Sequence, residues 1–203
     1  RDIRGVKVRV INAGPRPVEL RAGYLSKELQ LFPLFTPDGQ YDRTLERFGG
    51  LDILVNNVGR AGGKELLDTT DAEWQAAWTR TLTVNLTACA DLCRLAVQHF
   101  KANGGGRIVN VASRAAFRGD SPRHWHYAAS KSGMVGMTKT IARAYAADGV
   151  LAFCVAPGFT VSEMTEEYLT GRGGASILAD IPLGRVTSTT EVAEAIRWLA
   201  TEA

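Results

Sequence analysis

Tyr127 and Lys131 lie four residues apart, and together their side chains could exchange a proton with a bound molecule. In a helix this spacing puts both on one face, about one turn apart. Opposite charges about 4 Å apart at an effective dielectric of about 20 interact by roughly 4 kcal/mol, which would lower a tyrosine pKa of about 10 by up to about three units. We therefore expect a phenol poised for acid–base catalysis. Taken alone, a Tyr/Lys pair at this spacing is also typical of a solvated helix face without a catalytic role, and this alternative stays open.

Two further polar residues stand where chemistry is expected. Ser113 follows the apolar run 107–111, which is typical of a buried parallel strand, and ligands of parallel α/β folds bind at the carboxyl ends of strands. Its hydroxyl could hold a substrate oxygen, or it could be a turn or cap residue. Asn85 lies in a helical segment, where asparagine is a poor helix former, so we expect it to hydrogen-bond a buried carbonyl or a water.

From about residue 51 onward, short apolar runs alternate with longer amphipathic segments, which predicts right-handed βαβ units and a parallel sheet. The predicted strands are residues 51–55, 107–111 and 150–155. The predicted helices start at the capping boxes 70–73 and 188–191, or span residues 82–101 and 127–147, ending near Gly104 and Gly149.

The first 45 residues are atypical. Residues 6–11 alternate like a half-buried strand, and residues 44–49 are typical of a helix end. Four prolines interrupt the stretch between them, which leaves room for one or two helical turns near residues 24–31. We expect a single domain over residues 1–203, in which residues 46–203 form the regular part.

Six stretches from about residue 44 onward resemble the short-chain dehydrogenase/reductase family. In order they are residues 51–59 with the turn Asn-Asn-Val-Gly, Val84-Asn85-Leu86, residues 107–113, the Tyr-x-x-x-Lys pattern at 127–131, residues 156–164, and residues 181–185 followed by Glu191-Val192-Ala193. Val58 stands where the family's turn has alanine, and Ser162 stands where its later loop has threonine. One Tyr-x-x-x-Lys match is weak evidence, but the six motifs in this order are specific.

The resemblance implies an α/β fold, a Rossmann-like doubly wound parallel sheet with helices on both faces. It also implies a nicotinamide cofactor, NAD or NADP, and hydride transfer to or from the carbonyl or carbinol carbon of a small-molecule substrate. Tyr127 would exchange a proton with the substrate oxygen, and Ser113 would hydrogen-bond that oxygen. Lys131 would bind the nicotinamide ribose and lower the pKa of Tyr127, and Asn85 would position a water in a proton relay to Lys131.

Cofactor-binding residues follow from the same resemblance. Besides Tyr127 and Lys131, they are Asn57, Val58 and Gly59 on the adenosine side, and Pro157, Gly158, Thr160 and Ser162 on the nicotinamide and diphosphate side. Helices around Asn85 and after Tyr127 form the oligomer faces of this family, which implies a homodimer or homotetramer. The choice between NAD and NADP stays open, and so does the substrate, because substrate-selecting residues lie in the variable segments 114–126 and 163–179.

The family's Gly-x-x-x-Gly-x-Gly motif is absent from the sequence. Residues 12–17 hold one glycine and two prolines, and proline offers a diphosphate neither an N–H group nor a close approach. About 50 residues precede the Asn-Asn-Val-Gly turn, and the sequence ends in the last predicted helix. We therefore expect a sheet that is incomplete at the N-terminal βαβ unit and at the C-terminal strand. The alternative function is a catalytically impaired or non-enzymatic relative that acts as a binding or assembly subunit.

The composition of the chain also bears on its partners, its localisation and metal binding. The net charge of +3 is scattered in both signs, so we expect no nucleic-acid partner. Apolar stretches fall short of the roughly 20 residues that span a membrane, and the start lacks the apolar core of a signal peptide, so we expect a cytoplasmic protein. The three cysteines are expected to be buried free thiols without a metal. His124 and His126 could bind a metal or move a proton, but without a third ligand we expect loop or lid residues.

Overall fold

The structure is a computed structural model that describes residues 8–11, 45–46, 49–57, 59–65, 68–161 and 174–203. The helical turns expected near residues 24–31 lie outside the described residues. So do Val58 and Ser162, two of the expected cofactor-binding residues.

The described strands form one parallel sheet in the order β1-β2-β3-β4. The strands are β1 (Val8–Ile11), β2 (Ile53–Asn56), β3 (Gly106–Val111) and β4 (Val150–Val155). All four were expected from the sequence, although β2 begins two residues later than its apolar run and extends to Asn56. The parallel pairing confirms the predicted α/β class.

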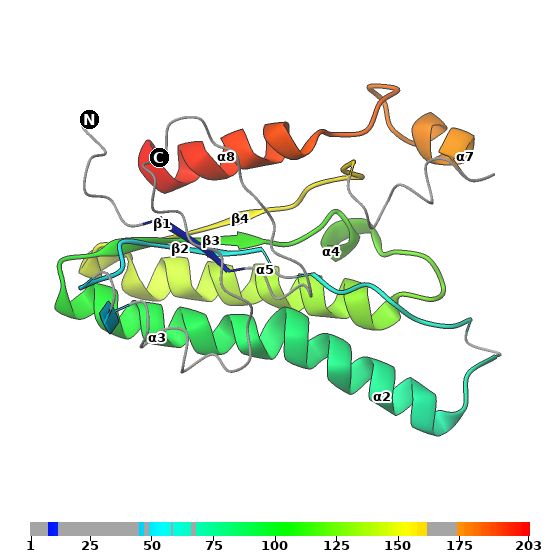
Figure 1. Cartoon of the computed structure of the whole chain (residues 1–203), viewed down its shortest axis with the longest axis horizontal. Helices are drawn as coiled ribbons and strands as arrows, with labels where there is room; N and C mark the ends of the chain where they lie inside the picture. The colour runs from blue at the N-terminus through cyan, green and yellow to red at the C-terminus, as the bar shows by residue number, and fades with distance from the viewer. Residues whose placement is uncertain (1–7, 12–44, 47–48, 58, 66–67, 162–173) are drawn as a thin grey trace.

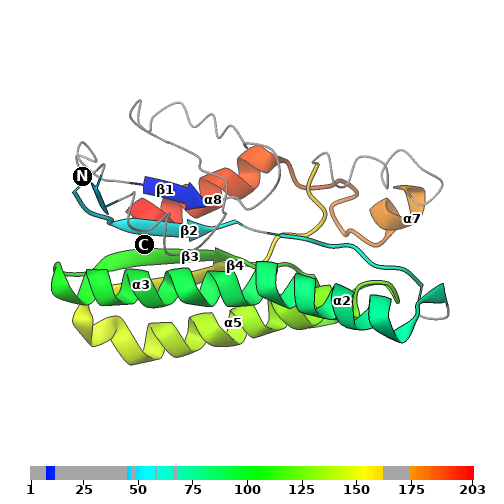
Figure 2. The ribbon, with the colours of Figure 1, turned by 60° about the horizontal axis from the view of Figure 1, so that its bottom comes forward.

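Helices cover both faces of this sheet (Figures 1 and 2). The long helices α3 (Ala88–Ala102) and α5 (Trp125–Tyr145) lie on one face, and α8 (Thr189–Thr201) lies on the other. Successive strand residues point to opposite faces, so β2, β3 and β4 each contribute to two cores. Leu54 and Ile108 pack under α3 and α5, whereas their neighbours Val55 and Val109 pack against Ala200 of α8.

The helix starts follow the expected capping boxes. In α2 (Asp71–Leu82) the Thr70 side chain accepts a hydrogen bond from the Glu73 N–H, and Glu73 bonds back to Thr70. Ser188 and Glu191 do the same for α8. The two helices expected over 70–101 join, because α2 continues through the π-helical segment η2 (Thr83–Thr87) into α3.

Shorter elements complete the described chain. They are α4 (Ala115–Arg118), the 3-10 segment η3 (Ala146–Asp148) and α7 (Gly174–Ala179). Gly149 follows η3 with a φ of 77°, a conformation suited to glycine, and so ends the helical run where the sequence predicts. No helix in the described ranges is long and apolar enough to cross a membrane. Cys89, Cys93 and Cys154 are free thiols; the first two are buried and the third is half-buried.

Candidate active site

The loops that follow β2, β3 and β4 leave the same edge of the sheet, because all three strands run in parallel (Figure 1). Gly59, Ser113 and Pro157 lie in these loops, each within three residues of its strand. The Arg114 N–H donates to the Pro157 carbonyl at 2.9 Å, which ties the second loop to the third. The topology therefore brings residues from three of the sequence motifs to one edge.

Tyr127 lies in the first turn of α5, and the Ser113 side chain lies near enough to its hydroxyl to act on its pKa. Ser113 Oγ also accepts from the Ala115 N–H at 3.2 Å, at the start of α4. Burial raises the pKa of Tyr127 above its ordinary value of 10.0, and the nearby Asp120 charge adds to this effect, while the Ser113 side chain opposes it. The phenol is therefore protonated at neutral pH.

Lys131 lies one turn further along α5 and is buried, with 2 % of its surface exposed. Its ammonium donates to the Val111 carbonyl at 2.8 Å, at the carboxyl end of β3. Gly59 lies so close that a Cβ on it would be 3.8 Å from Lys131 Nζ. Burial lowers the pKa of Lys131 to about 8, an effect that Cys89 and Cys154 partly oppose. The ammonium thus stands between the loop after β2 and the end of β3.

The expectation that Lys131 depresses the pKa of Tyr127 is wrong for this structure. The ammonium lies 5.9 Å from the centroid of the Tyr127 ring and is hydrogen-bonded to the backbone of β3. At that position its charge contributes less to the phenol than burial does. The spacing correctly predicts that Tyr127 and Lys131 share one face of the helix, but it does not predict where the longer lysine side chain points.

Asn85 is fully buried in the π-helical segment η2 and makes three hydrogen bonds. Its Oδ1 accepts from the Arg60 N–H at 2.8 Å, and its Nδ2 donates to the Arg60 carbonyl and to Ser130 Oγ, both at 3.0 Å. The expected bond to a carbonyl is present, but the carbonyl belongs to the exposed residue Arg60 and is not a buried one. Ser130 Oγ in turn donates to the Tyr127 carbonyl at 2.7 Å. Asn85 therefore connects the loop after β2 to the first turn of α5.

Similarity to known proteins extends over most of the chain. A sequence model of the family described as Enoyl-(Acyl carrier protein) reductase matches residues 38–203. A 3-oxoacyl-[acyl-carrier-protein] reductase, FabG of Haemophilus influenzae, is 36% identical over 155 residues, covering 76% of this chain and 62% of the relative. This chain belongs to the short-chain dehydrogenase/reductase family.

Two other family members match this chain with similar sequence identity and coverage. The uncharacterized short-chain type dehydrogenase/reductase y4mP of Sinorhizobium fredii is 34% identical over 165 residues, 79% of this chain and 62% of that protein. The cis-4-hydroxycyclohexanecarboxylate dehydrogenase of Sinomonas cyclohexanicum is 38% identical over 162 residues, 80% of this chain and 63% of that protein. The chain spans about three fifths of the length of these short-chain dehydrogenase/reductase relatives.

A polar network behind the site was not found from the family motifs. Asn56, the last residue of β2, donates to Asn110 Oδ1 of β3 at 2.8 Å, and Asn110 Nδ2 donates to Thr138 Oγ1 of α5 at 2.9 Å. All three side chains are buried. Buried amides need such partners, so two asparagines at matched positions of neighbouring strands were the available signal. The network joins two strands to the helix that carries Tyr127.

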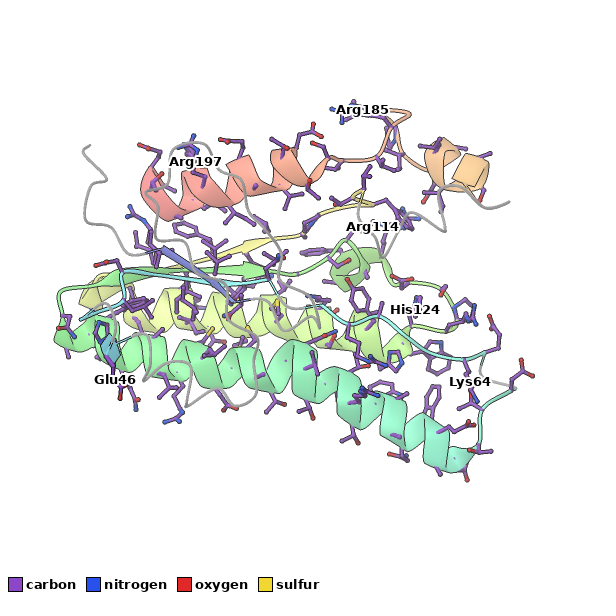
Figure 3. All side chains as sticks on the ribbon, in the orientation of Figure 1. Glu46, Lys64, Arg114, His124, Arg185 and Arg197 are labelled. Carbon is purple, nitrogen blue, oxygen red and sulfur yellow. The ribbon has the colours of Figure 1, made fainter. Side chains whose placement is uncertain are left out.

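His126 is not a loop or lid residue, contrary to expectation. It lies in the first turn of α5, is buried, and packs edge-on against Trp78 with ring centroids 6.2 Å apart. His124, which precedes the helix, bonds to Ser121 and Asp120 at 3.1 Å (Figure 3). The described part of the chain contains no group of three or more His, Cys, Asp or Glu residues that could hold a metal ion.

Burial of His126 should make the stability of the protein depend on pH. Burial lowers the pKa of its imidazole below 6.5, and the charges of His124 and Arg60 act in the same direction. The unfolded chain therefore takes up this proton more readily than the folded chain. We expect the free energy of unfolding to fall as the pH drops below about 6.5.

Urea unfolding of the natural chain and of His126→Gln, followed between about pH 8 and pH 5.5, measures this effect. The loss of stability on acidification should be smaller in the variant, because the glutamine does not titrate. Equal losses in the two proteins would contradict the assignment.

Proposed function

We propose that this chain transfers hydride between NAD or NADP and a carbonyl compound or secondary alcohol, with Tyr127 as acid and base. The observation that supports this most directly is the arrangement of Tyr127, Ser113 and Lys131. The Ser113 side chain lies near enough to the phenol to act on its pKa, and the buried ammonium lies one turn along the same helix. A bound nicotinamide would supply or accept the hydride.

The described residues fit such a cofactor. Gly59 and Gly158 carry no Cβ, Lys131 offers a buried ammonium beside Gly59, and Thr160 offers a hydroxyl in the loop after β4. A sugar hydroxyl can accept from the ammonium, and backbone can approach a ligand closely at the glycines. We assign cofactor contacts to Asn57, Val58, Gly59, Tyr127, Lys131, Pro157, Gly158, Thr160 and Ser162.

The raised pKa of Tyr127 determines its role at neutral pH. Because the phenol is protonated, it can donate its proton to a substrate carbonyl oxygen that Ser113 holds by a hydrogen bond. Alcohol oxidation requires the phenolate, so oxidation should need a higher pH than reduction. Asn85 fixes the first turn of α5 through Ser130, and we assign it the placement of a water that relays protons to Lys131.

The second candidate is a binding or assembly subunit without activity, and the sequence supplies the observation that favours it. No Gly-x-x-x-Gly-x-Gly motif follows β1, and two prolines stand there instead. Both candidates agree with a cytoplasmic homodimer or homotetramer. They differ in whether the chain holds a dinucleotide.

Titration of the chain with NADPH and NADH, followed by quenching of its tryptophans, separates the two. We expect saturable binding of one cofactor, and binding at least about tenfold weaker in Lys131→Met, because a charged hydrogen bond to the ribose is lost. Methionine at this buried position removes a desolvated charge but also the donor to the Val111 carbonyl, so folding of the variant is checked by urea unfolding before cofactor binding is compared.

The matched control is Lys139→Met, which changes an exposed lysine two turns further along α5 and should bind the cofactor as the natural chain does. If a folded chain binds neither cofactor at millimolar concentration, the non-enzymatic candidate is favoured. If Lys131→Met and Lys139→Met bind equally well, the assigned role of Lys131 is wrong.

A further inference from the structure

An arginine directly follows Ser113 and holds three segments together beside the site. The Arg114 side chain is 30 % exposed, and its guanidinium carbon lies 4.5 Å from the ring centroid of Phe159 in the loop after β4. Its Nη1 lies 3.5 Å from a carboxylate oxygen of Asp180, the residue after α7. Figure 3 shows the side chain leaving the start of α4 towards α7. A positive charge therefore lies next to the residue that we assign to the substrate oxygen.

Asp180 does not use its full hydrogen-bonding capacity on Arg114. The same carboxylate oxygen lies 2.7 Å from Arg118 Nη2, which is the length of a charge-assisted hydrogen bond, whereas the 3.5 Å to Arg114 is longer than one. Two guanidinium groups thus share one carboxylate, and the group of three carries a net charge of about +1 at neutral pH. A planar guanidinium fork suits a carboxylate better than it suits a neutral oxygen.

Electrostatic contacts relate Arg114 to Tyr127 through a third residue, Asp120. Burial acts to raise the pKa of Asp120. The hydrogen bond from His124 and weaker contributions, which include the charge of Arg114, together outweigh burial, so the pKa of Asp120 lies below its ordinary value. The same Asp120 raises the pKa of Tyr127. Arg114 and Tyr127 therefore both lie within electrostatic range of one carboxylate.

We propose that the substrate of this site carries a carboxylate, and that Arg114 binds it in place of Asp180 while Ser113 and Tyr127 hold the carbonyl oxygen. The substrate class is then the oxo acids and the corresponding hydroxy acids. Asp180 occupies the carboxylate position in the structure and stays with Arg118 when the substrate enters. This substrate class rests on the proposed function, whereas the binding of the anion needs no cofactor.

Ligand-observed NMR of the chain with acetoacetate, levulinate and their methyl esters tests the anion-binding step directly. We expect the acids to bind more tightly than the esters, and Arg114→Gln to weaken binding of the acids about tenfold to a hundredfold while the esters are unaffected. Asp180→Asn should tighten binding of the acids, because it removes the competing carboxylate. Arg143→Gln, at an exposed position in the last turn of α5, is the control and should leave all affinities unchanged.

A purely structural role for the ion pair gives the opposite pattern. Arg114→Gln and Asp180→Asn both break the same pair, so loss of an anchor for α7 would change binding in the same direction in both variants, and equally for acids and esters. Opposite effects on the acids support a carboxylate-binding arginine. Parallel effects, or equal binding of acids and esters by the natural chain, overturn it.

Turnover separates this inference from the proposed function. With the preferred nicotinamide, the natural chain should reduce the acids with a higher kcat/KM than the esters, and Arg114→Gln should remove that preference by raising KM for the acids. Reduction of acids and esters with equal kcat/KM, by both proteins, would leave the reaction intact and refute the anion site. Binding of the acids that depends on Arg114, without turnover, would support the anion site and count against the reaction.

Discussion

Replacing Tyr127 by phenylalanine is expected to lower kcat by about three orders of magnitude while the cofactor still binds. The variant loses only the hydroxyl, which is the group whose pKa the Ser113 side chain affects. The ring itself stays, and with it the contacts to Lys131 and to the His124 ring. The effect should therefore fall on the chemical step and not on the fold. Among the described residues no other phenol lies at this edge of the sheet, so no other tyrosine can take over the proton transfer.

Stopped-flow measurement of cofactor oxidation in a single turnover reports this step separately from product release. Tyr145→Phe is the matched control: it removes the same hydroxyl at the other end of α5, where Lys101 lies over the ring, and should leave kcat unchanged. If Tyr127→Phe retains more than about a tenth of the natural rate, Tyr127 is not the general acid.

Replacing Asn85 by leucine should cost about 2–4 kcal/mol of stability, because it leaves the Arg60 backbone and the Ser130 hydroxyl without their partner. The residue is fully buried, so water cannot replace the amide without rearrangement. Activity should also fall, since Ser130 bonds the carbonyl of Tyr127 and the first turn of α5 would move. The loss of kcat should exceed any rise in KM.

Urea unfolding together with steady-state kinetics checks both parts of this expectation. Thr87→Ala provides the comparison, because Thr87 is exposed in the same π-helical segment and should change stability by less than about 0.5 kcal/mol. A loss below about 1 kcal/mol in Asn85→Leu would mean that the three hydrogen bonds do not support the fold as described.

The parts of the fold that depend on neighbouring residues could be predicted from the sequence. The strands β3 and β4 coincide with their apolar runs within a residue, and the capping boxes at Thr70 and Ser188 begin the helices as expected. These signals are local: a β-rich run buried on both faces, or a side chain that bonds a backbone N–H three residues away. The gathering of Ser113 and Tyr127 was implied by the resemblance to the short-chain dehydrogenase/reductase family.

Features set by distant contacts could not be predicted. Asn85 bonds a backbone 25 residues away, and His126 is buried by Trp78 from another helix, neither of which leaves a periodic trace. The pKa of Tyr127 was expected in the wrong direction because spacing fixes the face of a helix but not desolvation or the carbonyl that captures Lys131. Site chemistry in this chain is thus decided by tertiary surroundings more than by the motif itself.

The two buried cysteine thiols of α3 can report how often the structure opens locally. Cys89 and Cys93 lie under the sheet, at 2% and 1% exposure, and both approach the Asn110 amide at the centre of the polar network. A water-borne thiol reagent can reach them only when α3 lifts away from the strands, so the labelling rate counts those openings. Any molecule that binds only the closed form slows the rate in proportion to its occupancy. Ligand binding is therefore measurable from the labelling rate of the cysteines in α3, a helix that the ligand does not contact.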